Sequence, residues 1–92
     1  MIVALALAAC SRGGDAGTLE DGLKQPLSRV YGPIESVRCE ESDTVTIPGG
    51  GTAYDCTLNL ERGGTQVVCA GRAKGVPLFE RTPCNQSRFP SR

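Results

Sequence analysis

Residues 52–60 read Thr-Ala-Tyr-Asp-Cys-Thr-Leu-Asn-Leu, and the rest of the chain can be placed around this stretch. Its large apolar or sulfur-bearing residues fall at every second position: Tyr54, Cys56, Leu58 and Leu60. Because successive side chains of a strand point to opposite faces, this alternation predicts a strand with one buried face and one wet face. The following Glu-Arg-Gly-Gly, residues 61–64, predicts a turn, and residues 65–73 predict the returning strand.

The loop of this hairpin predicts its register. With a four-residue loop, Leu60 pairs with Thr65. The same register sets Cys56 directly opposite Cys69, so both cysteines are expected to face one core.

Two further strands are predicted on either side of the hairpin. Residues 34–39 form a short strand, and the acidic residues 40–43 close it. Residues 44–51 are β-prone at first and end in a mobile Pro-Gly-Gly-Gly loop. Residues 75–82 form the last strand, and Pro77 places it at the edge of the sheet because proline has no N–H for a second neighbour.

One helix is predicted between Thr18 and Gly32. Thr18 offers a capping hydroxyl, and the acidic Asp21 follows three residues later. Apolar residues recur at helical spacing and make the helix amphipathic: Leu19, Leu23, Leu27, Val30 and Tyr31. Pro26 removes a backbone hydrogen bond at a cost of about 3 kcal/mol, so we expect a kink there, the alternative being a second, shorter helix. A helix laid on a three- or four-stranded antiparallel sheet is an α+β fold.

Size and composition narrow the class of protein. A domain over residues 18–84 is too small to be stable on a hydrophobic core alone, so the five cysteines suggest a covalent staple. The chain has no histidine, which excludes imidazole catalysis and histidine-containing metal sites. Ten acidic and ten basic residues exclude a strongly basic nucleic-acid binder. These features predict an exported, disulfide-stapled, non-enzymatic domain without a cofactor.

The N-terminal residues 1–9, Met-Ile-Val-Ala-Leu-Ala-Leu-Ala-Ala, carry no polar side chain. As a helix they span about 13 Å, too short for a bilayer core of about 30 Å. An apolar run that ends in small residues is typical of a secretory signal peptide. No basic residue precedes Arg12, so we expect the true start codon upstream of Met1. The alternative is a buried N-terminal element followed by a free cysteine.

Residues 7–10, Leu-Ala-Ala-Cys, resemble the lipobox of bacterial lipoproteins, in which signal peptidase II cleaves before the cysteine and its sulfur carries a diacylglycerol. The resemblance implies that Cys10 becomes a lipidated first residue, that membrane lipid is a partner, and that the protein lies in the cell envelope. Residues 10–17 then form the lipidated cysteine with a flexible, glycine-rich tether. The polar residues 85–92 are expected to be a disordered tail.

With Cys10 assigned to lipid, the remaining cysteines form an even set, which favours two disulfides in an oxidising compartment: Cys39, Cys56, Cys69 and Cys84. Pairing Cys39 with Cys56 and Cys69 with Cys84 closes loops of about 15 to 17 residues, each worth about 3 kcal/mol. The alternative joins Cys56 to Cys69 across the hairpin and leaves Cys39 with Cys84. We favour the first arrangement.

Residues 19–60 show a second resemblance. A helix, a glycine, Ser-Val-Arg-Cys at 36–39 and Tyr-Asp-Cys-Thr at 54–57 are similar to small two-cysteine domains of unknown function in actinobacterial lipoproteins. The resemblance covers about half of the chain and implies that Cys39 pairs with Cys56.

The charged residues do not indicate a metal site, but acidic and basic residues are unevenly distributed along the chain. Residues 40–43 hold three carboxylates without the spacing of a calcium loop, so we expect a solvated loop and not a metal site. Residues 10–47 carry a net charge of −3, and residues 48–92 carry +3. Five of the basic residues are candidates to face an anionic surface or an acidic envelope protein, although we favour ordinary surface solubility as their role: Arg72, Lys74, Arg81, Arg88 and Arg92.

The sequence therefore predicts a membrane-anchored envelope lipoprotein that acts as a binding or structural module. The alternative is an inhibitor that presents residues 43–52 to a hydrolase from a preorganised scaffold.

Overall fold

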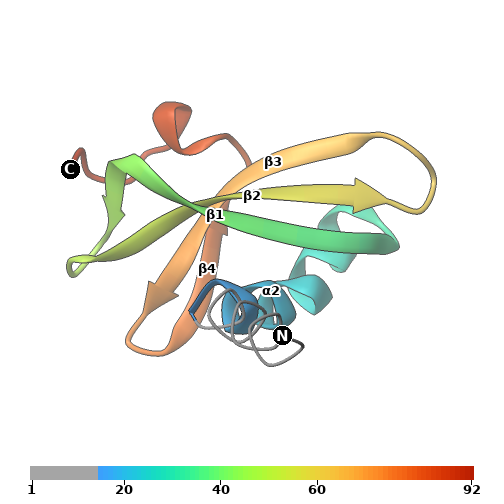
Figure 1. Ribbon diagram of the computed structural model, residues 1–92, viewed down its shortest axis with the longest axis horizontal. Helices are drawn as coiled ribbons and strands as arrows, with labels where there is room; N and C mark the ends of the chain where they lie inside the picture. The colour runs from blue at the N-terminus through green and yellow to red at the C-terminus, as the bar shows by residue number, and fades with distance from the viewer. Residues whose placement is uncertain (1–14) are drawn as a thin grey trace, which may run out of the picture.

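The computed structural model describes residues 15–92 and shows one helix packed on a four-stranded antiparallel sheet (Figure 1). The elements are α2 (Asp15–Tyr31), β1 (Ile34–Ile47), β2 (Gly51–Leu60), β3 (Thr65–Ala73), β4 (Val76–Glu80) and the short 3-10 helix η1 (Cys84–Gln86). The strands lie in the order β1-β2-β3-β4, so β4 with its Pro77 is an edge strand, as predicted. Within the described range, no helix has both the length and the hydropathy needed to cross a bilayer. The predicted signal peptide and Cys10 lie outside the described residues.

The helix α2 begins earlier than predicted and ends where predicted. Residues 15–17, expected in the tether, belong to its first turn. At the other end Gly32 adopts a left-handed conformation with φ +86°, and its N–H donates to the Ser28 carbonyl at 2.9 Å. This is a glycine cap of the kind that terminates many helices. Pro26 lies inside one uninterrupted helix, which rules out the alternative of a second, shorter helix.

The strand β1 is longer than predicted. It runs without interruption through the acidic residues 40–43, which were expected to close it. Glu40, Glu41 and Asp43 are exposed, so their charges are compatible with a strand at the edge of the sheet. The pairing with β2 shifts between Glu41 and Thr46, and β1 changes direction in this region (Figure 1). An irregularity of this kind bends a strand and lets its end turn away from the main sheet direction.

The predicted register of the β2–β3 hairpin is wrong by one residue. Cys56 lies opposite Val68, and Cys69 lies opposite Asp55. The cause is the turn, where the Leu60 N–H donates to the Gly64 carbonyl and the first ladder pair outside the loop is Asn59 with Thr65. Because side chains alternate, this slip places Cys69 on the face opposite Cys56.

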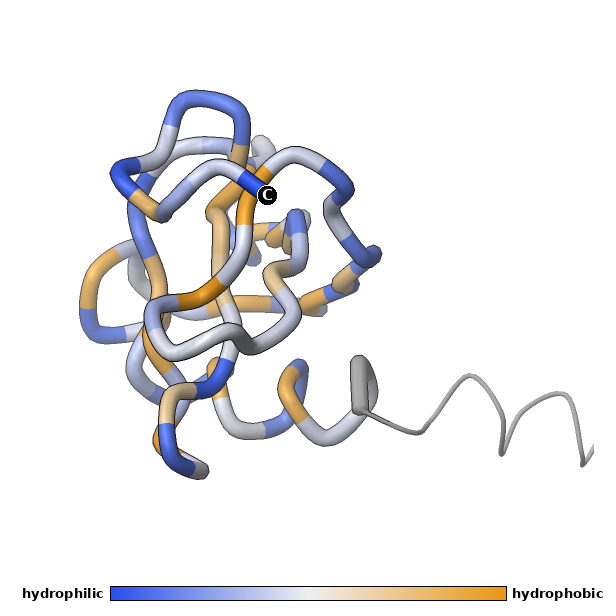
Figure 2. The backbone as a smooth tube through the Cα atoms, turned by 90° about the vertical axis from the view of Figure 1, so that its left-hand side faces the viewer, coloured by the Kyte–Doolittle hydropathy of each residue, from blue (hydrophilic) through white to orange (hydrophobic). Residues whose placement is uncertain are grey.

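The sheet is therefore covered on both faces. On the face of β2 expected to be wet, Ala53 is fully buried, Asp55 and Thr57 are half-buried and Asn59 is exposed. Between α2 and the sheet lies the helix-side cluster: Leu19, Leu23, Leu27, Ile34, Cys39, Cys56, Leu58, Val68 and Ala70. On the other face lies the tail-side cluster: Val45, Ile47, Ala53, Cys69 and Cys84. Figure 2 shows α2 on one side of the sheet and the C-terminal segment on the other.

The C-terminal residues 85–92 were expected to be disordered, and this is wrong. They pack along the end of β1, where the Thr46 N–H donates to the Pro90 carbonyl at 2.9 Å and the Arg92 N–H donates to the Thr44 carbonyl at 3.0 Å. Phe89 packs against the tail-side cluster. The segment is ordered because it satisfies backbone groups at an open strand edge and partly buries an aromatic ring.

Gly71 in β3 gives a direct test of the tail-side cluster. An added Cβ would lie 2.8 Å from the Thr52 carbonyl oxygen and would overlap the Ile47 side chain. Gly71→Ala is expected to lower the free energy of unfolding by about 1–3 kcal/mol, as overpacking does in well-packed cores. Denaturant titration measures the change. Gln66→Ala, at an exposed position of the same strand, serves as control and should stay within about 0.5 kcal/mol of the parent.

Candidate functional site

The four cysteines of the described residues form two disulfides, Cys39–Cys56 and Cys69–Cys84. This is the connectivity favoured from the sequence. Cys39 and Cys56 lie directly opposite each other on β1 and β2, in the helix-side cluster. Cys69 and Cys84 join β3 to η1 in the tail-side cluster. Each face of the sheet therefore carries one covalent staple.

In each disulfide, the backbone N–H of one cysteine donates a hydrogen bond to a carboxylate. The Glu20 carboxylate on α2 accepts a hydrogen bond from the N–H of Cys39 at 2.7 Å. The Asp55 carboxylate on β2 accepts one from the N–H of Cys84 at 2.8 Å. Hydrogen bonds to ionised acceptors are stronger than neutral ones, so these two contacts fix the helix and the C-terminal segment onto their faces.

The acidic side chains of residues 40–43 are exposed along β1. No cluster of three or more potential metal-ligating side chains occurs anywhere between residues 15 and 92. Asp43 lies 3.9 Å from the Arg92 guanidinium, and because both side chains are more than half exposed this pair contributes little to stability.

The segment 43–52, proposed from the sequence as a presented loop, is mostly strand. Residues 43–47 belong to β1 and residues 51–52 to β2. Only residues 48–50 form the turn, and the Gly50 N–H closes it by donating to the Ile47 carbonyl at 2.9 Å.

Three of the basic side chains singled out from the sequence have separate neighbours. The Arg81 guanidinium lies 5.9 Å from the centre of the Tyr31 ring. Arg92 lies beside Asp43, and Arg72 reaches α2 from β3. Arg72 and Arg81 each line a pocket that also has apolar and hydroxyl groups. The residues that line the Arg81 pocket include the carboxylate of Glu80, whereas those that line the Arg72 pocket include no carboxylate.

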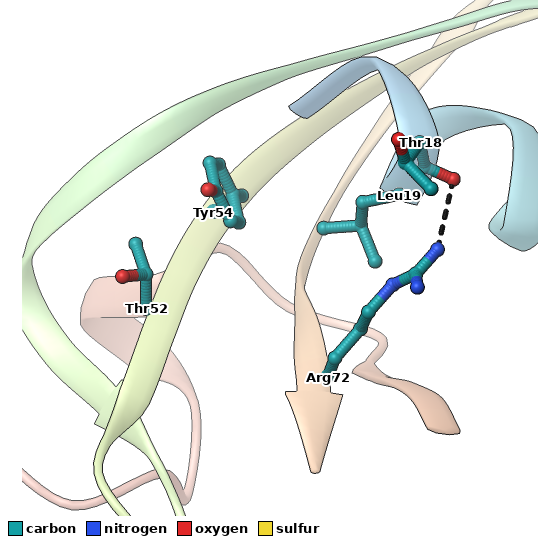
Figure 3. Close-up of a pocket in the computed structure, with 5 residues that line it drawn as sticks. All are labelled: Thr18, Leu19, Thr52, Tyr54 and Arg72. Atoms are coloured by element: carbon teal, nitrogen blue, oxygen red, sulfur yellow. Dashed lines mark hydrogen bonds between the residues drawn. The ribbon is translucent and has the colours of Figure 1, made fainter. Parts of the chain in front are cut away.

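The Arg72 pocket, a depression of about 260 Å³, lies between the first turns of α2 and the sheet (Figure 3). Five described residues line it: Thr18, Leu19, Thr52, Tyr54 and Arg72. None of the five carries a carboxylate. The Nη2 atom of Arg72 donates to the Thr18 carbonyl at 3.1 Å, so the guanidinium is held across the mouth between β3 and α2.

Gly22 leaves room for this arrangement. A Cβ at Gly22 would lie 3.3 Å from the Pro77 ring and 3.5 Å from Nη2 of Arg72. A glycine inside a helix is unfavourable by about 1 kcal/mol relative to alanine. Here it permits close approach of α2 to β3 and β4, which brings Arg72 up to the helix.

The Arg72 pocket offers a cationic donor group beside an apolar side chain, which suits a small anion that carries an apolar group. A guanidinium has five N–H donors in a planar fork that matches carboxylate and phosphate oxygens, and only one donor is used on Thr18. Leu19 is 1% exposed and forms an apolar wall. Ligand pockets for drug-sized molecules measure roughly 300–1,000 Å³, so this one suits a single charged group.

No pattern in the sequence groups these residues. Thr18 was predicted as a helix cap, Tyr54 as a core residue and Arg72 as one of several surface cations. They come together only because β2 and β3 pair and α2 crosses them at that end (Figure 3).

Comparison with known proteins gives no relative: no protein-family model, curated protein or solved structure matches this chain.

Proposed function

We propose that this protein is a lipoprotein of the bacterial cell envelope, anchored through Cys10, whose domain is a non-enzymatic binding module. One observation supports it above the others. All four cysteines of the described residues are joined to one another, so of the five in the sequence Cys10 is the one outside a pair. Paired cysteines are typical of exported proteins, and an odd cysteine in such a protein needs a separate role. The Leu-Ala-Ala-Cys sequence at residues 7–10 supplies that role, lipidation.

The folded domain begins only a few residues after the proposed lipid anchor. Because α2 begins at Asp15, four residues separate it from Cys10. Two or more acyl chains bind a membrane stably, whereas one chain binds it only marginally. A diacylglycerol on Cys10 would hold the domain at the membrane surface and not far above it.

The binding role is supported by the Arg72 pocket and by the covalent staples around it. We also infer that α2 is amphipathic, since its three leucines at positions 19, 23 and 27 are buried while the polar Asp21, Lys24 and Arg29 are exposed. Val30, expected on the apolar face, is 43% exposed instead. A rigid scaffold lowers the entropy lost on binding, which favours a module that holds a ligand.

Lipidation can be tested by intact-mass analysis of the native product from its bacterial membrane. The expected protein lacks residues 1–9 and carries a diacylglycerol on the sulfur of Cys10. Cys10→Ser should abolish the modification and move the protein from the detergent phase to the aqueous phase in phase partitioning. Ser11→Ala keeps the cysteine and should leave partitioning unchanged. A native product that still begins with an unmodified Met1 would overturn the proposal.

Inhibition of a hydrolase remains the alternative. Affinity capture from envelope extract separates the two, because a stoichiometric hydrolase partner that is lost when residues 48–50 are replaced would favour inhibition.

A further inference from the structure

We propose that the Arg72 pocket binds the phosphate of an anionic phospholipid headgroup in the same membrane that holds the Cys10 anchor. This inference rests on the proposed function, because the anchor is what brings the pocket to the lipid. The ligand class is a phosphodiester with a small polar alcohol, and phosphatidylglycerol is a lipid of this class.

Covalent geometry limits how far the pocket can stand from the anchor. Five residue steps from Cys10 to Asp15 span at most about 18 Å, even if fully extended. Three helical steps from Asp15 to Thr18 add about 4.5 Å. Thr18 forms part of the pocket wall, and these spans place its Cα within about 23 Å of the Cα of Cys10. This reach is shorter than the thickness of one bilayer core, about 30 Å. The anchor would therefore keep the pocket close to the phosphate groups of the headgroup layer.

The residues that line the Arg72 pocket suit a phosphate group that is attached to an apolar molecule. Arg72 offers a charged, planar donor set, and phosphate oxygens accept from it in a bidentate manner. Thr52 lines the far side of the pocket on β2, and the Leu19 side chain lies between it and Arg72 as an apolar wall (Figure 3). No acidic side chain among the five lining residues opposes an anion. Lys74, two residues beyond Arg72, adds a second positive charge in the turn after β3.

Two further pockets among the described residues fit an anion less well. The pocket lined by Arg81 and Arg88 includes the Glu80 carboxylate, which accepts a hydrogen bond from the Arg88 N–H at 3.3 Å. The pocket beside Arg38 includes Glu20, which is engaged by Cys39. A carboxylate in the lining repels an incoming phosphate, so the Arg72 pocket is the better site.

Binding can be measured on the full chain carrying Cys10→Ser, with both disulfides formed. The ligand is dihexanoyl-phosphatidylglycerol below its micelle concentration, and the readout is the NMR signal of the Arg72 side-chain Nε–H and of the Tyr54 amide. We expect saturable shifts at both groups. Arg72→Gln should weaken binding about tenfold or more, and Arg72→Lys should weaken it less, because it keeps the charge and loses the fork.

Matched controls separate a site from general charge attraction. Arg62→Gln removes the same charge at the opposite end of the β2–β3 hairpin and should leave affinity within about twofold. Dihexanoyl-phosphatidylcholine, which is zwitterionic, should bind about tenfold more weakly or not at all. Amide spectra of all variants check that the fold is kept.

Three results would overturn the inference: no saturable shift at Arg72, equal affinity for inorganic phosphate and for the lipid, or equal losses in Arg62→Gln and Arg72→Gln. Equal affinity for inorganic phosphate would identify a free-phosphate site instead. Because this assay uses a chain without an anchor, its failure leaves the lipidation of Cys10 standing, and lipidation is judged separately by mass.

Discussion

Replacing Cys69 and Cys84 together by alanine is expected to lower the free energy of unfolding by about 3 kcal/mol and to release the C-terminal segment. The bond closes a sequence separation of 15 residues, and removing such a cross-link adds roughly that much entropy to the unfolded chain. It also attaches η1 to the tail-side cluster, where both cysteines are fully buried. Small domains are stable by only about 5–15 kcal/mol, so this loss is a large share of the total.

Denaturant titration measures the stability, and hydrogen exchange of the Thr46 and Arg92 amides reports on the segment, because both donate between β1 and residues 90–92. The matched control replaces Cys39 and Cys56 by alanine, a bond of sequence separation 17 with nearly the same loop entropy. Both variants should lose a similar free energy of unfolding. Only in the Cys69–Cys84 variant should the Thr46 and Arg92 amides exchange faster than the other amides of the sheet. Equal protection in the two variants would show that the bond does not hold the segment.

Leu23→Ala is expected to cost about 2–5 kcal/mol, the range measured for buried leucines in well-packed cores. Leu23 lies in the middle of α2, is fully buried and belongs to the helix-side cluster. Its truncation removes apolar contacts and leaves a cavity between the helix and the sheet. Chemical denaturation of the disulfide-intact protein measures the loss.

Val30→Ala on the same helix is the control for this change. Val30 is 43% exposed, so its replacement should cost less than about 1 kcal/mol. If the two substitutions cost the same, α2 is not packed on the sheet as described.

Local patterns were sufficient to predict the main elements. The alternation of residues 52–60 gave β2, and Gly32 followed by Pro33 marked the end of α2. These signals lie within a few residues of the structure that they specify. They describe one helix and an antiparallel sheet without any knowledge of distant contacts.

The features that sequence analysis missed depend on contacts distant in the chain or on turn geometry. The hairpin register depends on whether the last pair of the β2–β3 ladder includes Leu60 or whether Leu60 belongs to the loop. Gly63 and Gly64, both at positive φ, form a turn in which Leu60 belongs to the loop. The order of residues 85–92 depends on Cys84 and on the open edge of β1. The Arg72 pocket draws on α2, β2 and β3 at once, so no local motif could mark it.

The order of the cysteines along the chain bears on how the protein would mature. Each disulfide joins neighbours in sequence, the first to the second and the third to the fourth of the set that begins at Cys39. If the chain is exported from its N-terminus, as we propose, an oxidant that joins thiols in their order of emergence would yield the native bonds directly. Maturation would then require no reshuffling by an isomerase, and reduced precursor should recover both bonds with a simple oxidising catalyst.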